Sequence, residues 1–202
     1  MQTQDYLKLL VEKIHSAALA TLDDEGRPQT RIIDMMLWDE RGVYFLTAKG
    51  KAFYRQLMKQ GYVALSATKD KVSVSLRGRI RNIHAEKLDE IFNRNPYMKA
   101  IYPGDTRTAL EVFWLYEAEG EYFDIRDPSH VTRDSFAIGC PNQKPVGYFI
   151  TQRCTGCGKC LTVCPQKCID IAQTPAIIDA KRCLHCGRCA ERCEIRAVEM
   201  RG

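Results

Sequence analysis

The chain has 202 residues, of which 45% are hydrophobic, and a formal net charge of +5. This size and composition can bury a core as one domain or two small ones, which excludes wholesale disorder. The longest apolar run is five residues (112–116), whereas a membrane-spanning helix needs about 20. The first fifteen residues are charged and do not resemble an export signal. We therefore expect a cytoplasmic protein without membrane attachment.

The first two thirds of the chain read as strands with a few helices. Tyr6, Leu9, Leu10 and Ile14 recur at helical spacing and predict an opening helix, capped by Thr3 or Asp5. Two further helices are expected at 52–60 and 85–93. The expected strands are 17–22, 30–37, 43–47, 63–67, 72–83, 110–116 and 121–125. Many short strands joined by tight turns indicate an antiparallel barrel or sandwich, so the predicted fold class is mainly β with helices (α+β).

Two lysines lie between the expected strand 43–47 and the helix 52–60. Lys49 and Lys51 would combine with free N–H groups and the positive end of the helix to bind a phosphate group. The alternative is an ordinary solvated loop, because surface lysines are common.

In strand 72–83, Arg77, Arg79 and Arg81 alternate with apolar residues and form one basic face. This face is either solvated, turned to a second subunit or a path for an anionic substrate.

The order of these elements resembles a known fold over about residues 4–126. The helix is followed by A-L-A-T-L, D-D-E-G-R-P-Q-T-R, G-V-Y-F-L-T-A-K-G-K and Y-R-Q-L-M, which is similar to the FMN-binding split barrel of the pyridoxamine 5′-phosphate oxidase-like superfamily. The resemblance implies bound FMN and a homodimer with FMN in the subunit interface. It implies flavin contacts at Arg31, Thr47, Lys49, Lys51 and Gln56.

One departure concerns the flavin phosphate. The pyridoxamine phosphate oxidases proper carry a serine-arginine-lysine triplet where this chain reads Lys51-Ala52-Phe53. The phosphate clamp is therefore built differently, and oxidation of vitamin B6 is not the expected activity. No catalytic residue is assigned from the sequence.

The cysteines divide the chain. Nine of the ten follow residue 150, and thiols this dense in a chain without a secretion signal indicate metal ligands rather than disulfides. We expect a first domain at 1–138, a linker at 139–151 containing Cys140, and a second domain at 152–202. Because metal-bound thiolates add negative charge, the basic excess of the second domain does not indicate nucleic-acid binding.

The cysteine array repeats one spacing, C-x2-C-x2-C-x3-C, and this is the ligand run of a two-cluster ferredoxin, in which the fourth cysteine binds the other cluster. The first [4Fe-4S] cluster is assigned Cys154, Cys157, Cys160 and Cys193. The second is assigned Cys183, Cys186, Cys189 and Cys164. Zinc is the alternative, since C-x2-C also binds zinc, but zinc gives no reason for the third cysteine or the repeated x3 offset.

Residues 150–200 resemble the bacterial-type 2[4Fe-4S] ferredoxin, with short strands expected at 169–171 and 176–178. The second run ends in Cys193-Glu194, where that family usually has proline. Cys168 is expected to be a buried small hydrophobe rather than a ninth ligand. His185 lies between two ligands and is either solvent-facing or a hydrogen-bonding residue that tunes a cluster.

Together the two domains predict redox function. Clusters exchange single electrons, and FMN can pass two on as a hydride. We expect an iron–sulfur flavoprotein of an anaerobic or microaerobic organism that reduces a small organic substrate and exchanges electrons with a redox partner protein such as a ferredoxin or reductase. The alternatives are a relay without its own substrate and a redox sensor; no DNA-reading element is present to support a sensor that controls transcription.

Overall fold

The computed structural model describes residues 1–139 and 146–201, which form two compact units. The first unit comprises Met1–Lys69, Ser73–Tyr122 and residues 135–139, and the second comprises Asp70–Val72, Phe123–Asp134 and residues 146–201. Residues 140–145 of the expected linker, Cys140 among them, lie outside the described residues. Every helix in the described ranges is too short or too polar to pass through a lipid bilayer.

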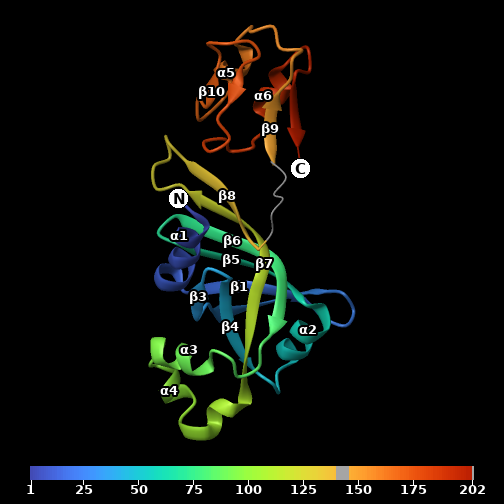
Figure 1. Ribbon diagram of the computed structural model, residues 1–202. Coiled ribbons are helices and arrows are strands. Elements are labelled where there is room, and N and C mark those ends of the chain that lie inside the picture. The colour runs from blue at the N-terminus through green and yellow to red at the C-terminus, as the bar shows by residue number, and fades with distance from the viewer. Residues whose placement is uncertain (140–145, 202) are drawn as a thin grey trace. The chain divides into compact units, whose positions relative to one another are not determined.

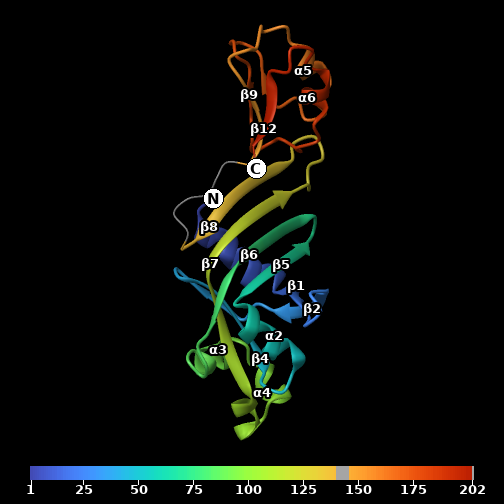
Figure 2. The same cartoon turned by 90° about the vertical axis from the view of Figure 1, so that its right-hand side faces the viewer.

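Eight strands form one sheet, in the order β2-β1-β5-β6-β7-β4-β3, with β8 paired to β7. Figures 1 and 2 both show β5, β6 and β7 side by side as long, twisted strands. The strands are β1 (Ser16–Leu22), β2 (Pro28–Asp34), β3 (Leu37–Asp39), β4 (Gly42–Ala48), β5 (Tyr62–Lys69), β6 (Val72–Asn82), β7 (Leu110–Asp124) and β8 (Thr132–Ile138).

The connection between β2 and β3 explains why this sheet curls. The two strands lie at opposite ends of the strand order, yet only Met35 and Met36 separate them in sequence. Since each residue spans at most about 3.3–3.6 Å, the two edges of the sheet must come close together. The result is a half-open barrel, which confirms the predicted split barrel. The sequence predicted one strand at 30–37; it breaks because Met35 and Met36 are both buried, which regular alternation does not allow.

Alternating burial defines the inner face of the barrel. In β5, Val63, Leu65 and Ala67 are buried while their neighbours are exposed. The expected break near residue 120 is absent, and β7 runs on as a 15-residue strand. Gly120 is needed there for space rather than for a turn, because a side chain at this position would collide with the ring of Phe136 on β8.

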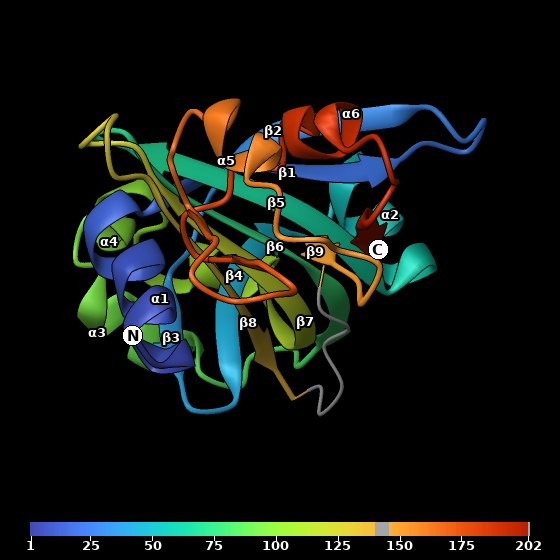
Figure 3. The ribbon, with the colours of Figure 1, turned by 90° about the horizontal axis from the view of Figure 1, so that it is seen from above.

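Helices pack against the strands of the barrel. The chain opens with α1 (Thr3–Lys8), which continues as the π-helix η1 (Leu9–Ile14); its cap is Gln2, which forms a capping box with Asp5, and not Thr3 or Asp5 as expected. Figures 1 and 3 show α2 (Ala52–Gln60) and α1 on opposite sides of the strands. The remaining helices, which follow β6, are α3 (Leu88–Arg94), α4 (Met98–Ile101) and the 3-10 helix η2 (Gly104–Ala109). The buried side chains of Ile91 and Phe92 on α3 pack with Tyr44 and Val112 of the sheet.

The second unit is small and rich in turns. Strand β9 (Gly147–Ile150) pairs with β12 (Val198–Arg201), so the two ends of its cysteine-rich part lie side by side. The expected hairpin is confirmed in shorter form, as β10 (Ile169–Asp170) paired with β11 (Ile177–Ile178). Each of the two cysteine runs contains one short helix, α5 (Lys159–Thr162) in the first and α6 (Arg188–Arg192) in the second, and each helix begins directly after a glycine.

Candidate cofactor sites

Four thiols surround one cavity in the second unit. Its wall contains Cys154, Cys157, Cys160 and Cys193, together with apolar side chains such as Ile150. The first three come from the loop before α5 and from α5 itself, and Cys193 follows the last turn of α6. The structure therefore brings together the four residues that the spacing assigned to the first cluster.

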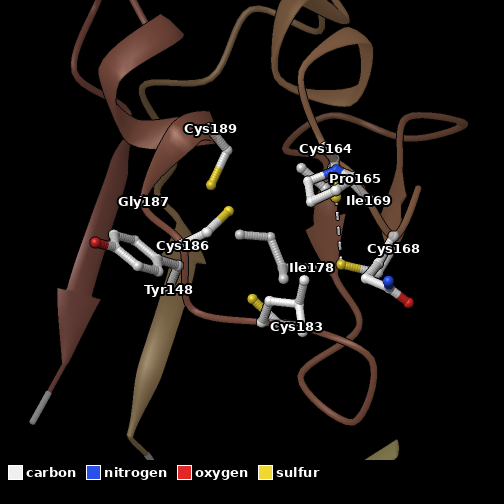
Figure 4. A pocket seen from close by; sticks show the side chains of 12 residues that line it. Tyr148, Cys164, Pro165, Cys168, Ile169, Ile178, Cys183, Cys186, Gly187 and Cys189 are labelled. Atoms are coloured by element: carbon white, nitrogen blue, oxygen red, sulfur yellow. Dashed lines mark hydrogen bonds between the residues drawn. The ribbon is translucent and has the colours of Figure 1, made fainter. Parts of the chain in front are cut away.

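A second cavity gathers the other four assigned cysteines. Its wall contains Cys183, Cys186, Cys189 and Cys164, closed by apolar residues. Figure 4 shows the sulfurs of Cys183, Cys186 and Cys189 reaching into the space from one side, opposite Cys164 and Pro165. Each cavity thus takes three cysteines from one run and the fourth from the other.

Each cavity is lined by the four cysteines assigned to one cluster. A [4Fe-4S] cluster receives four thiolates, one at each iron. Burial raises the pKa of Cys189 to about 11 and also raises that of Cys160. Thiolates at these positions therefore need a bound metal to stabilise their charge.

Backbone amides point at the ligand sulfurs. The N–H of Gly156 donates to Cys154 Sγ at 3.4 Å, that of His185 to Cys183 Sγ at 3.4 Å, and that of Ala197 to Cys193 Sγ at 3.2 Å. Gly156 and His185 both have a positive φ, of 73° and 56°, which turns the amide back towards the preceding ligand. Such donors stabilise the negative charge on a thiolate and on a bound cluster.

Cys168 is a fifth thiol on the wall of the second cavity. It is 5% exposed, and its Sγ lies 3.6 Å from Cys164 Sγ, the contact drawn in Figure 4. Burial, reinforced by the neighbouring Cys164, raises its pKa well above that of an ordinary thiol. The neutral, apolar form is thus favoured, in keeping with the expectation of a small buried hydrophobe.

In the barrel, the resemblance pointed to Arg31 and Gln56, and the structure brings them together. Arg31 on β2 donates to the side-chain oxygen of Gln56 on α2 at 3.1 Å and to Thr21 Oγ1 at 2.5 Å. Its guanidinium lies 4.3 Å from the centre of the Phe53 ring. Sequence reasoning missed Thr21 and Phe53; Thr21 lies at one of the alternating buried positions of β1, a signal that could have found it.

Thr47 has an unused hydrogen-bonding group. It is 2% exposed at the end of β4, and its Oγ1 is buried without a hydrogen-bond partner among the described residues. Buried hydroxyls are normally paired, so an unpaired one indicates a group that binds there. The residues present therefore fit a polar cofactor such as FMN at this end of β4.

Lys49 and Lys51 lie in the exposed turn between β4 and α2. Lys51 is the residue before the first turn of α2, a nine-residue helix with no acidic residue in that turn. No carboxylate in the described ranges lies within ion-pair distance of either ammonium group. Among the described residues no contact joins these lysines to Arg31, so of the five predicted flavin residues only Arg31 and Gln56 contact each other directly.

Lys49 also borders an open pocket that sequence reasoning did not find. The pocket wall includes His84, Arg107 and Glu111. Glu111 accepts hydrogen bonds from Tyr54 and Asn82, each at 2.6 Å, and lies 3.3 Å from His84 Nδ1. Burial alone would raise the pKa of Glu111, but these hydrogen bonds outweigh it and lower the pKa to about 2.

A half-open barrel with a polar pocket, joined to a unit with two cavities that each gather the four cysteines of one cluster, defines a flavoprotein-type barrel fused to a two-cluster iron–sulfur domain. Comparison with known families agrees. Residues 3–122 match the pyridoxamine 5′-phosphate oxidase family, and residues 153–197 match the 4Fe-4S dicluster domain. The chain belongs to the pyridoxamine 5′-phosphate oxidase family and carries a 4Fe-4S dicluster ferredoxin domain after its FMN-binding domain.

Individual relatives are distant. The chain is 25% identical over 142 residues to dihydrophenazinedicarboxylate synthase from Pseudomonas chlororaphis, covering 69% of this chain but only 60% of that relative. A NimC/NimA family protein from Clostridium acetobutylicum shares the fold with a TM-score of 0.56 at 18% identity, covering 67% of this chain and 92% of that one.

A second protein from Clostridium acetobutylicum, related to general stress protein 26, has a TM-score of 0.52 at 16% identity and covers 67% and 96% of the two chains. Both structures support the fold.

Proposed function

We propose that the chain is an iron–sulfur flavoprotein oxidoreductase, in which two [4Fe-4S] clusters exchange single electrons with FMN and FMN reduces a small organic substrate. The observation that carries this proposal is the presence of two cavities, each lined by the four cysteines of one cluster, in a chain whose other unit is an FMN-binding barrel. FMN, when bound, supplies the conversion between one-electron and two-electron chemistry.

The chain's own residues have separable tasks in this proposal. Arg31, held by Thr21 and Gln56, presents a fixed positive charge next to Phe53. The buried Thr47 hydroxyl, which has no partner among the described residues, would donate a hydrogen bond to bound FMN. Lys49 and Lys51, with the free N–H groups at the start of α2, bind the phosphate.

The substrate is proposed by class only. The relative from Pseudomonas chlororaphis is named for producing dihydrophenazinedicarboxylate, which supports a small, flat organic acid as substrate. The second candidate, a relay that passes electrons between redox proteins without its own substrate, is supported by the same dicluster domain. We further propose a cytoplasmic homodimer in an anaerobic setting, served by a ferredoxin or a reductase.

The first experiment is anaerobic purification followed by an absorption spectrum and analysis of iron, sulfide and flavin. About eight irons and one FMN per chain support the proposal. Iron without flavin, even after FMN is supplied, leaves only the relay, and zinc in place of iron overturns both. To distinguish an enzyme from an electron relay, the reduced protein is mixed with oxidised aromatic carboxylic acids. Reoxidation of the flavin together with conversion of the acid supports an enzyme. Reoxidation only by an added ferredoxin supports a relay.

A further inference from the structure

An arginine contacts the ligand loop of the second cavity. Arg133 Nη1 donates to Nδ1 of His185 at 2.9 Å, and His185 lies between Cys183 and Cys186. The imidazole also packs on Gly147, where any side chain would collide with it. Since Nδ1 accepts this hydrogen bond, the neutral ring carries its proton on Nε2.

Arg133 is firmly held. Its backbone N–H donates to the carbonyl oxygen of Lys181 at 2.6 Å, and its guanidinium lies 5.0 Å from the ring centre of Phe123. Two residues earlier, the N–H of Val131 donates to the buried side chain of Gln166 at 3.1 Å. The segment 123–134 is thus fixed to the loops that carry the second set of ligands.

A second arginine lies directly beside the same ligands. Arg182 precedes Cys183 and donates from Nη2 to the carbonyl oxygen of Gln166 at 3.0 Å. Among the described residues, three buried side-chain nitrogen or oxygen atoms lack a hydrogen-bond partner: Thr47 Oγ1, Arg133 Nε and Arg182 Nε. Two of the three are guanidinium N–H groups next to one ligand loop, and unpaired buried donors of this kind indicate an anionic acceptor.

The two cavities differ in how nearby positive charge is compensated. Next to the first cavity, Lys159 pairs with Glu194 at 2.7 Å, and Arg153 pairs with Glu199. Within the part of the chain that the structure describes, neither Arg133 nor Arg182 has a carboxylate within 4.0 Å. Arg192, beside Cys193, is exposed, so water screens its charge. Partly buried, uncompensated charge is therefore concentrated at the second cavity.

We propose that Arg133 and Arg182 set the order in which the two clusters are reduced, so that the cluster held by Cys183, Cys186, Cys189 and Cys164 has the higher potential. Reduction by one electron from a low-potential reductant lowers the charge of a cube by one and requires no proton. Fixed cations nearby stabilise the more negative state. Guanidinium groups stay protonated at all working pH values, so the effect does not depend on titration. This inference rests on the iron–sulfur part of the proposed function.

The test is a redox titration of the complete holoprotein with dithionite and mediators, followed by low-temperature EPR. Arg133→Gln and Arg182→Gln should each lower the higher of the two cluster potentials, with at least a tenfold change in the equilibrium constant, or about 59 mV. Arg133→Lys, which keeps the charge, should shift it less than Arg133→Gln. Lys159→Gln and Arg153→Gln are the matched controls at the first cavity and should leave the higher potential unchanged.

Iron content is measured for every variant. If Arg133→Gln binds fewer than about eight irons per chain, the cluster potentials of Arg182→Gln alone are compared with those of wild type. An unchanged higher potential in Arg182→Gln, or an equal fall of both potentials, overturns the proposal while leaving the proposed function intact. A wild-type protein without iron would instead overturn the proposed function itself.

Discussion

Arg31 and Gln56 are joined by a hydrogen bond of 3.1 Å that connects strand β2 to helix α2. The same Gln56 oxygen accepts a hydrogen bond from Thr21 at 2.6 Å, so one amide oxygen links three elements. Burial lowers the pKa of Arg31, although the guanidinium remains charged. The barrel therefore presents a cation whose position is fixed before any ligand arrives.

Replacing Arg31 should weaken flavin binding without unfolding the barrel. Loss of charge-assisted hydrogen bonds costs about 1.5–3 kcal/mol, so Arg31→Ala should bind FMN roughly ten- to a hundredfold more weakly. Fluorescence titration of the flavin-free protein with FMN measures this change. Arg27→Ala, which removes an exposed arginine from the preceding turn, should bind like wild type. Wild-type affinity in Arg31→Ala would exclude this residue from the flavin site.

Reversing the charge of the turn before α2 should remove the flavin and spare the iron. Lys49→Glu combined with Lys51→Glu places two carboxylates where the phosphate dianion would bind, so we expect no retained FMN and about eight irons per chain. Lys8→Glu with Lys99→Glu makes the same charge change at two exposed positions elsewhere in the barrel. Flavin content equal to wild type in the first variant would refute the phosphate assignment.

Cys168 should be dispensable for both clusters. Eight other thiols line the two cavities, and Cys168 is neutral and buried, so Cys168→Ala should retain about eight irons. Cys189→Ala, a variant of similar burial, should lose the second cluster. Iron and sulfide analysis with EPR of the reduced protein distinguishes the two variants. A loss of iron in Cys168→Ala would identify it as a ligand.

Glu111 should make the free energy of unfolding of the barrel depend on pH in the acid range. Because its pKa is about 2 when folded and near 4.5 when unfolded, its ionised form contributes on the order of 3 kcal/mol above pH 4.5. That contribution is lost as pH falls from about 4.5 towards 2. The stability difference between wild type and Glu111→Gln should therefore shrink as the pH falls below about 4.5.

Urea unfolding followed by tryptophan fluorescence measures this difference, since Trp38 and Trp114 both lie in the barrel unit. Glu119→Gln, at a half-exposed glutamate that pairs with Arg77, is the control for the loss of one carboxylate. A wild-type-minus-Glu111→Gln difference that is the same at pH 7 and pH 3.5 would contradict the role assigned to the hydrogen bonds from Asn82 and Tyr54.

Features that depend on local sequence patterns could be predicted from the sequence, whereas contacts between residues far apart in the chain could not. The cysteine spacing predicted the composition of both cavities, because each run shapes its own loop and a short helix carries its fourth thiol onward. The alternation in 72–83 predicted a strand with one basic face, and β6 is indeed buried at every second position while Arg77, Arg79 and Arg81 are exposed. The contact of Arg133 with His185 joins residues 52 positions apart, and no periodicity reports such a pairing. Strand β8 was missed because its sequence, T-R-D-S-F-A-I, is mostly polar and is held by pairing with β7.

Each cavity takes its fourth cysteine from the other run, and this arrangement has a consequence for a chain cut by a protease. Residues 171–174 form an exposed stretch between the runs, before β11. A protease that cuts there would produce two peptides, each contributing ligands to both cubes. We expect these peptides to migrate together for as long as iron is bound and to separate when a chelator strips it, with no covalent bond between them.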